Sequence, residues 1–335
     1  MAEFELGIPP SQRPDVQNPQ HQEYQYLDLA HNILATGHDK PSLGGGIELR
    51  GVFGRQHRYD LASGFPVLTT KQVAWKTAFR EMLWFISGDS NIKTLVDQNI
   101  HIWDDWPHRN YEEAAKKGDV PMLSIDEFAA KIKEEDNDSE FVTKWGELGP
   151  VYGSQWRRWK SSDGREIDQL AWSIDKMKRT PTRKHNVVTA WNPEFIYEMA
   201  APGSKMMDLP PCHMIFQLDS EDNKLSLMMT QRSADLFLGV PFNIAQYALL
   251  TRILAHVTDM QPGELVHNFG NVHIYENHRD QILEQINRVP RPLPTLTINQ
   301  DKKDVDSFTI EDFSLNGYDP HPPIRGEVAR VGGMF

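Results

Sequence analysis

The sequence has a single cysteine, Cys212, among 335 residues. One cysteine cannot form an intramolecular disulfide, so nothing in the sequence indicates an oxidising compartment. The first 25 residues have neither the basic nor the apolar region of a secretory signal peptide, and no apolar run is long enough to span a bilayer. These absences predict a cytoplasmic protein with no membrane partner.

Metal-binding and nucleic-acid-binding patterns are missing as well. The 13 histidines are scattered, without paired cysteines or a His-Glu-x-x-His segment, so we expect no metal. The formal net charge of −12 argues against nucleic acid as a partner, because contacts to a phosphate backbone need a basic field. A mononucleotide is still compatible, since a few arginines in a pocket can bind one phosphate in an acidic protein.

The lone cysteine follows Pro210 and Pro211 and precedes His213. A free cysteine is usually a small buried apolar residue, but such a residue needs neither a stiff proline pair before it nor the Arg-Ser-Ala-Asp run at 232–235. We therefore interpret Cys212 as a nucleophile. Adjacent strand residues point to opposite faces, so His213 is a poor direct base, and a nearby arginine is the expected source of thiolate stabilisation.

Other polar side chains could bind an anion, a sugar or a proton. The basic run 183–185 and Arg232 could bind phosphate, although the run alone is more often a solvated loop. His273 and Tyr275 alternate onto one face, where they either bind a sugar hydroxyl or pair in the core. Glu81 lies in an apolar helix pattern; if buried, its pKa rises and it becomes a candidate proton relay.

The order of predicted elements indicates an α+β fold. Residues 1 to about 25 are rich in Pro, Gln and Asn and predict a mobile arm, followed by a single domain over 26–335. Within that domain, the charged segment at about 110–144 predicts a surface insertion. The helices are expected at 26–34, 76–86, 167–178, 244–257 and 278–288. The strands are expected at 47–59, 186–191, 214–218, 224–230, 266–275, 296–298 and 308–310.

Taken together, these residues resemble the thymidylate synthase family, whose members methylate deoxyuridylate (dUMP) to dTMP with a reduced folate. The similarity extends from about residue 26 to 329. The matching segments are 64–71, 81–91, 102–106, 148–157, 211–213, 231–243, 273–275, 291–294 and 317–322. The resemblance implies an α/β three-layer sandwich on a bent mixed sheet. It also implies a homodimer that shares phosphate ligands across its interface, with 5,10-methylenetetrahydrofolate as co-substrate.

The resemblance also implies roles for individual residues, with Cys212 adding to C6 of the uracil and Asn243 reading its edge. The implied catalytic set is Cys212, Glu81, Tyr152, His213, Asp235 and Asn243. The implied substrate-binding set is Arg183, Lys184, Gln231, Arg232, Ser233, Asn243, His273 and Tyr275. The implied folate-binding set is Trp103, Trp106, Asp235, Leu238 and Phe242.

The sequence departs from the family in three places. The loop at 40–46 has no arginine where the family has one, and the partner-donated arginine pair aligns with Lys184 and His185, with Arg183 as a substitute. The chain also continues through 330–335, beyond the residue at which the family normally ends.

These departures leave two alternatives open. A looser lid would admit water, which would suit a dUMP 5-hydroxymethylase of the same family, whereas Trp103 and Tyr152 favour methylation. A catalytically silent nucleotide- or RNA-binding relative is an alternative of another class. Cys212, Glu81 and Asn243 argue against that alternative, and the net charge of −12 argues against RNA.

Overall fold

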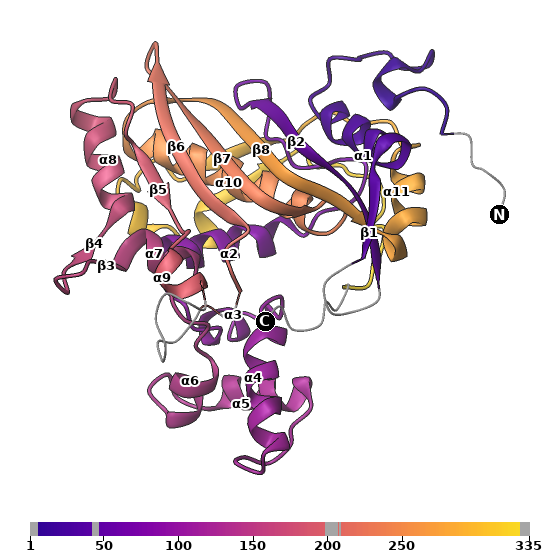
Figure 1. Ribbon diagram of the computed structural model, residues 1–335. Coiled ribbons are helices and arrows are strands. Elements are labelled where there is room, and N and C mark those ends of the chain that lie inside the picture. The colour runs from indigo at the N-terminus through magenta and orange to yellow at the C-terminus, as the bar shows by residue number, and fades with distance from the viewer. Residues whose placement is uncertain (1–5, 42–46, 198–206, 208, 329–335) are drawn as a thin grey trace.

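The centre of the fold is a six-stranded mixed sheet (Figure 1). The computed structural model describes residues 6–41, 47–197, 207 and 209–328. Across the sheet the strands are β1 (His38–Pro41), β2 (Glu48–Asp60), β8 (Gln261–Tyr275), β7 (Lys224–Asp235), β6 (His213–Glu221) and β5 (Val187–Thr189). The β7–β8 pair is parallel and the other neighbours are antiparallel. This mixed sheet with its packed helices confirms the predicted α+β class.

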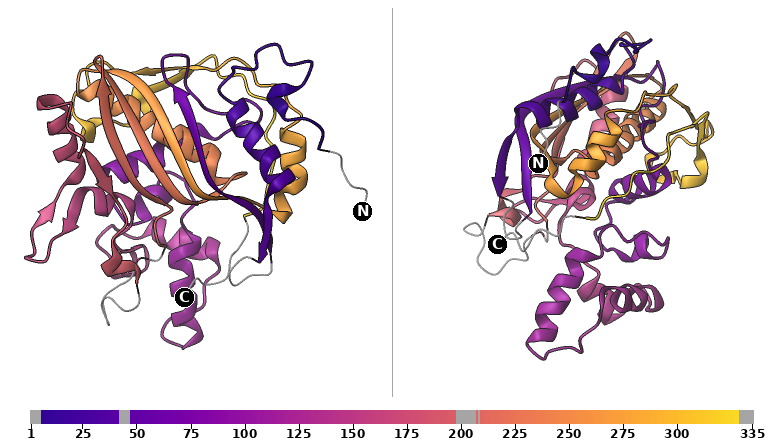
Figure 2. Two further views of the ribbon diagram at one scale, coloured as in Figure 1. Left: turned by 45° about the horizontal axis from the view of Figure 1, so that its top comes forward. Right: turned by 90° about the vertical axis from the view of Figure 1, so that its right-hand side faces the viewer.

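The parallel pair depends on helix α10 (Gly239–Val257), which connects β7 to β8. Parallel neighbours need a crossover connection, and a helix is the usual one. The sequence of α10 is apolar on nearly all sides, and the helix is buried along almost its whole length, as the pattern predicts. Helix α10 packs with α2 (Trp75–Ser87) on one face of the sheet (Figures 1 and 2). In the described part of the chain, no helix covers the opposite face of β6 and β7 (Figure 2).

Helix α2 ends at a residue that only glycine fits. Gly88 has a φ of +74°, and its N–H donates to Phe85 O. A Cβ on Gly88 would lie 2.8 Å from Cβ of Arg157, so a side chain is excluded by space as well as by φ. The glycine thus lets α7 (Tyr152–Arg158) pack directly against the end of α2.

The remaining elements surround this centre. The helices are η1 (Pro10–Gln12), α1 (Tyr24–Thr36), α3 (Lys93–Val96), α4 (Asp105–Lys116), α5 (Ile125–Glu134), α6 (Glu140–Trp145), α8 (Gln169–Arg179), α9 (Pro193–Ile196), η2 (Glu276–His278), α11 (Arg279–Gln285), η3 (Val305–Ser307) and η4 (Ile310–Asp312). Two small sheets pair β3 (Trp159–Lys160) with β4 (Glu166–Ile167) and β9 (Thr295–Ile298) with β10 (Phe313–Asn316). No helix in the described ranges is long and apolar enough to cross a membrane.

The strand predicted at 308–310 is wrong, because that segment contains the start of the short helix η4. Thr309 and Asp312 form a reciprocal capping box, in which the Thr309 N–H donates to Asp312 Oδ2 over 2.8 Å. Such local side-chain bonds offer the backbone an alternative to a strand ladder. The strand that pairs with β9 is β10, which begins at Phe313.

The charged segment at 110–144 forms the end of α4 together with α5 and α6, which project away from the sheet (Figure 1). Its few apolar side chains meet in a cluster, with Tyr111, Phe128, Ile132 and Val142 all buried. The Tyr111 and Phe128 ring centroids lie 5.4 Å apart. The segment therefore has its own small core beneath a charged surface, and its role as an insertion stays a prediction.

The described part of the N-terminal segment contacts the rest of the protein. Ser11 N donates to Asp28 Oδ1 over 3.0 Å, and Arg13 donates to Ile286 O over 2.9 Å. Glu23 is 2% exposed, and its carboxylate accepts four hydrogen bonds of 2.6–2.8 Å from the backbone and hydroxyls of Thr69 and Thr70. The mobility predicted for residues 1 to about 25 stays a prediction, but the segment is attached at these points.

We predict that Glu23→Ala lowers the free energy of unfolding by at least about 3 kcal/mol, because it leaves buried donors without a charged acceptor. Urea unfolding followed by tryptophan fluorescence measures this change. Glu276→Ala is the control: this glutamate is 57% exposed and lies 3.5 Å from Arg279, so its removal should change stability by less than about 0.5 kcal/mol. Equal effects of the two variants would contradict the structural role of Glu23.

Candidate active site

Cys212 lies where the chain enters β6, and two backbone hydrogen bonds fix its position. Its N–H donates to the Tyr152 hydroxyl over 2.8 Å, and its carbonyl accepts from Arg232 N over 2.8 Å. The first partner belongs to α7 and the second to β7, so the cysteine is held between two elements that are distant in the sequence. Cys212 as a whole residue is half-buried.

Burial raises the pKa of the Cys212 thiol, while the charge of Arg232 and a hydrogen bond from Tyr152 oppose that rise. Arg232 is thus a source of thiolate stabilisation, as the sequence led us to expect, but desolvation outweighs its positive charge. The neutral thiol is the resting form at neutral pH, and the proton has to leave when the sulfur reacts.

Arg232 binds the backbone that precedes the cysteine. Its guanidinium donates to Pro210 O over 2.6 Å and to Pro211 O over 3.1 Å, and it lies 5.6 Å from the ring centroid of Trp191. Proline carbonyls keep their acceptor capacity although proline has no N–H. Arg232 therefore holds the proline pair rigid, a role that the sequence did not reveal, and its remaining N–H groups can still bind an anion.

Glu81 is buried in α2 and accepts one hydrogen bond on each carboxylate oxygen. Trp103 Nε1 donates to Oε1 over 2.7 Å, and Gln246 Nε2 donates to Oε2 over 2.6 Å. Burial raises the pKa of Glu81 to about 7, with the two hydrogen bonds opposing the rise. The carboxyl group is therefore poised to gain or lose a proton near neutral pH, as a proton relay requires.

A chain of buried amides joins Glu81 to the sheet. Asn243 Nδ2 donates to Gln246 Oε1 over 3.3 Å, and Gln231 Nε2 donates to Asn243 Oδ1 over 3.0 Å. His267 Nε2 lies 2.8 Å from Gln231 Oε1. Of these residues, Gln246 and His267 were absent from the predicted site. Gln246 carries a signal that could have found it, since it is polar in a helix buried on all sides and lies one turn from Asn243.

Tyr152 and His213 form an aromatic layer next to Cys212. The Tyr152 ring stacks on Phe85 with centroids 4.8 Å apart and lies 5.3 Å from the His213 ring. Burial lowers the pKa of His213 to about 4, and a hydrogen bond with Asn243 opposes this shift. His213 is therefore neutral at physiological pH, so it cannot stabilise a thiolate by charge.

Asp235 ends β7 and shapes the turn into α10. Its Oδ1 accepts from Phe237 N over 3.0 Å and from Leu238 N over 3.3 Å. His273 of β8 is its direct neighbour in the parallel register, and the rings of His273 and Tyr275 meet edge to face at 5.0 Å. Burial, with Asp235 and Cys212 nearby, raises the pKa of Tyr275 to about 12. The predicted sugar ligands are thus brought to the same region as the cysteine.

The remaining predicted residues lie around this centre. Ser233 is half-buried in β7, opposite Asn271. Trp103 is buried, and Trp106 lies half-buried in α4, beneath the Arg109 guanidinium at 4.9 Å from its ring centroid. The other predicted folate contacts, Leu238 and Phe242, are half-buried at the start of α10.

Arg183 and Lys184 are not brought to the cysteine within one chain. Both are exposed, and Lys184 Nζ forms an ion pair of 3.0 Å with Asp219. Asp219 lies seven residues along β6 from Cys212, which corresponds to about 23 Å at the usual strand rise of about 3.3 Å per residue. The predicted phosphate cluster is therefore divided between two places on the chain.

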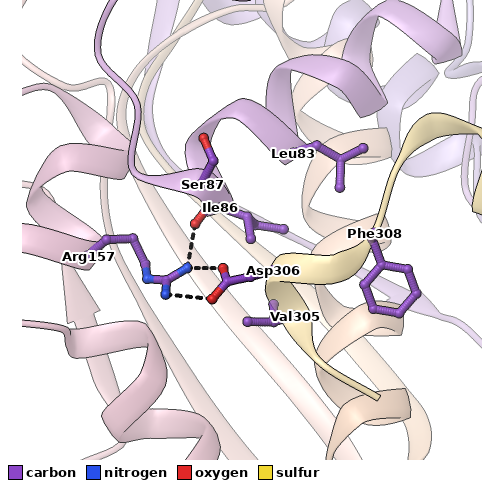
Figure 3. Close-up of a pocket in the computed structure, with 7 residues that line it drawn as sticks. All are labelled: Leu83, Ile86, Ser87, Arg157, Val305, Asp306 and Phe308. Carbon is purple, nitrogen blue, oxygen red and sulfur yellow. Dashed lines mark hydrogen bonds and ion pairs between the residues drawn. The ribbon is translucent and has the colours of Figure 1, made fainter. Parts of the chain in front are cut away.

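Helix α2 also borders a pocket of about 250 Å³ on another side, away from the predicted site residues (Figure 3). Arg157 and Asp306 form a bidentate ion pair there, and Arg157 also donates to Ile86 O over 2.7 Å. Arg157 thereby ties α7, which carries Tyr152, to α2, which carries Glu81. With its donors used by these partners and by Asp168, we assign it a structural role.

The predicted loop difference at 42–46 and the extension at 330–335 lie outside the described residues. Within the described ranges, no group of three or more His, Cys, Asp or Glu side chains could hold a metal ion.

Comparison with known proteins identifies the family of the chain. The sequence model of the family described as thymidylate synthase matches residues 24–330. The thymidylate synthase of Zymomonas mobilis subsp. mobilis is 45% identical over 312 residues, which cover 92% of this chain and 99% of that protein. The chain therefore belongs to the thymidylate synthase family and is a methyltransferase.

Proposed function

We propose that this protein methylates dUMP to dTMP with 5,10-methylenetetrahydrofolate, through a covalent bond between Cys212 Sγ and C6 of the uracil. The observation that carries the proposal is the buried amide chain. It connects Glu81, a carboxyl group with a pKa of about 7, to Asn243, whose neighbour His213 adjoins the single cysteine. A nucleophile, a proton carrier and a reader of a planar ring thus share one buried region.

The proposed chemistry begins at the cysteine. When Cys212 Sγ bonds to C6, its proton leaves and the C5–C6 electrons move toward O4, so that C5 becomes nucleophilic. C5 then bonds to the one-carbon unit of the folate co-substrate. Loss of the C5 proton and of tetrahydrofolate leaves an exocyclic methylene. Hydride transfer from tetrahydrofolate completes the methyl group and gives dihydrofolate, and the sulfur departs from C6 as the double bond re-forms.

The protein groups have separate tasks in this scheme. Glu81 and Tyr152 manage proton movement, Glu81 because its pKa is near neutral and Tyr152 because its hydroxyl touches the backbone of Cys212. Asn243 pairs with O4 and N3–H of the uracil. In the proposed complex Arg232 and Ser233 bind the phosphate, and His273 and Tyr275 bind the sugar 3′-hydroxyl.

We propose that the folate binds to Trp103, Trp106, Asp235, Leu238 and Phe242. Indole and phenyl rings suit stacking against a flat heterocycle, the leucine adds apolar contact, and Asp235 supplies hydrogen-bond acceptors.

We also propose a homodimer in the cytoplasm, built on the open face of the sheet. Phe216 packs against Tyr247 of α10 at 6.3 Å, so its strand neighbour Ile215 faces away from the helices. Ile215 and Met228 are 36% and 37% exposed, which is high for residues of central strands. A second copy covering this face would bury them, and could bring its own basic loop to the phosphate that Arg232 binds.

The wild-type protein should form dihydrofolate in proportion to the dUMP that it consumes. The Cys212→Ser variant should keep less than about a hundredth of the wild-type rate, because a hydroxyl is a far weaker nucleophile than a thiol. Absorbance at the dihydrofolate band and tritium release from C5-labelled dUMP measure the two steps. Nucleotide turnover without dihydrofolate would instead indicate a hydroxymethylase. Serine activity above that level would refute covalent catalysis by Cys212.

Asn243→Asp should move the preference of the enzyme from dUMP toward dCMP. A carboxylate can accept from the 4-amino group of cytosine but cannot donate to O4 of uracil. The ratio of kcat/KM for the two nucleotides measures the change. An unchanged ratio would mean that Asn243 does not read the base.

Mixing two defective variants tests the shared phosphate site. Cys212→Ser lacks the nucleophile, and an Arg183→Ala/Lys184→Ala variant lacks the loop cations. Refolded together in equal amounts, they should recover about a quarter of wild-type activity, because about half of the dimers are mixed and each holds one complete site. A mixture no more active than its components would show that the loop serves its own chain or no site.

A further inference from the structure

We infer that Gln246 is a positioning residue that fixes which end of the Asn243 amide donates and which accepts, and thereby the preference for uracil over cytosine. This inference rests on the proposed role of Asn243 as the base reader. In the proposed function Gln246 only links Glu81 to Asn243 and has no chemical step of its own, and it acts on the base through its hydrogen bond to Asn243.

The orientation of the Asn243 amide decides which base it can pair with. Uracil presents a donor at N3 and an acceptor at O4, whereas cytosine presents an acceptor at N3 and a donor at the 4-amino group. Rotation of the amide by 180° exchanges its oxygen and nitrogen. One orientation therefore matches uracil and the other matches cytosine, while the shape of the side chain stays nearly the same.

An acceptor at each end of the amide chain sets its direction. When Glu81 is ionised its carboxylate only accepts, so Gln246 presents its NH₂ to Glu81 Oε2, at 2.6 Å, and its oxygen to Asn243 Nδ2. From the other side, Gln231 Nε2 donates to Ser233 O over 3.0 Å and to Asn243 Oδ1. Both neighbours thus favour the same orientation of the Asn243 amide, with Nδ2 toward Gln246 and Oδ1 toward Gln231.

Beyond these two bonds the Asn243 amide has one hydrogen and one lone pair, and a hydrogen bond with His213 uses one of them. A uracil edge needs both a donor and an acceptor, so the base has to replace His213 as the partner of the Asn243 amide. Reversal of the amide would set Asn243 Oδ1 against Gln246 Oε1 and Nδ2 against Gln231 Nε2. Burial makes this reversal costly, since Gln246 is 1% exposed and water cannot easily replace a lost partner.

Gln246 also affects Glu81, because its N–H stabilises the charged carboxylate. The other groups that face Glu81 are Trp103, which donates to it, and Tyr247 of α10, whose pKa is raised well above its usual value mainly by burial, with the Glu81 charge contributing. Tyr152 of α7 lies behind Trp103, with ring centroids 5.9 Å apart. Neither tyrosine is ionised at neutral pH. The hydrogen bonds from Gln246 and Trp103 are therefore the direct contacts that favour the ionised form of Glu81.

The main test replaces Gln246 with methionine, which has a similar size and shape but neither donates nor accepts strongly. The ratio of dissociation constants for dUMP and dCMP, measured by calorimetry, should fall by about tenfold, a change typical of one lost hydrogen bond. Gln285→Met is the matched control. Gln285 is likewise a buried glutamine with two side-chain partners, Tyr26 and Thr70, but it has no contact with the amide chain, so its ratio should not change.

A second variant separates the two effects of Gln246. In Gln246→Glu an oxygen still accepts from Asn243 Nδ2, so the preference for dUMP should persist. In Gln246→Glu the second acid beside Glu81 raises the apparent pKa of the two carboxyl groups. In Gln246→Met the loss of the Gln246 donor raises the pKa of Glu81. The midpoint of the pH–rate limb that reports Glu81, expected near 7 in the wild type, should therefore rise in both variants.

The outcomes distinguish this inference from the proposed function. If the wild type does not discriminate dUMP from dCMP, or Asn243→Asp leaves the ratio unchanged, the role of Asn243 fails. If Asn243→Asp changes the ratio while folded Gln246→Met keeps both the wild-type ratio and the wild-type pH midpoint, the inference about Gln246 is overturned. Should Gln246→Met not fold, loss of dUMP preference in Gln246→Glu would overturn it equally.

Discussion

A buried carboxylate that needs donors on both oxygens constrains the interior of this protein. Removing Glu81 from water is costly, and the structure limits that cost by directing an indole and an amide at it. An ionised carboxylate only accepts hydrogen bonds, so Gln246 donates to Glu81. Asn243 in turn donates to Gln246 and Gln231 donates to Asn243, and His267 Nε2 contacts Gln231 Oε1 at the end of the chain. Four elements, α2, α10, β7 and β8, are thereby set in one mutual arrangement.

The parallel pair of β7 and β8 explains why the site is built largely from one stretch of chain. The crossover through α10 brings β7, the helix and β8 together, and these elements carry Arg232, Asp235, Asn243 and His273. Asp235 accepts hydrogen bonds from backbone N–H groups of the turn that begins the crossover. Side chains on packed strands and on a buried helix are held more exactly than side chains on loops, which suits a site that must align two substrates.

Charge has a smaller part in this site than the sequence indicates. Desolvation keeps Cys212 as a thiol and His213 as a neutral ring, although Arg232 lies close to the thiol. Arg232 and Arg157 use much of their donor capacity on backbone carbonyls and carboxylates that connect elements. A pocket of low polarity makes each remaining hydrogen bond more selective, because an unmatched partner cannot be compensated by water.

The sequence by itself determined the family, the α+β class and the central buried helix, because long matching segments and an unbroken apolar pattern are local properties of the chain. It also indicated that Glu81, Cys212 and Asn243 belong together. Local patterns failed at 308–310, where a capping box overrode strand-like residues. Only the tertiary structure could decide that Gln246 and His267 join the site, that burial outweighs Arg232 at the thiol, and that Arg183 and Lys184 lie at the far end of β6. Those outcomes depend on contacts between residues tens to hundreds of positions apart, where desolvation and hydrogen-bond direction are set by neighbours that no local pattern contains.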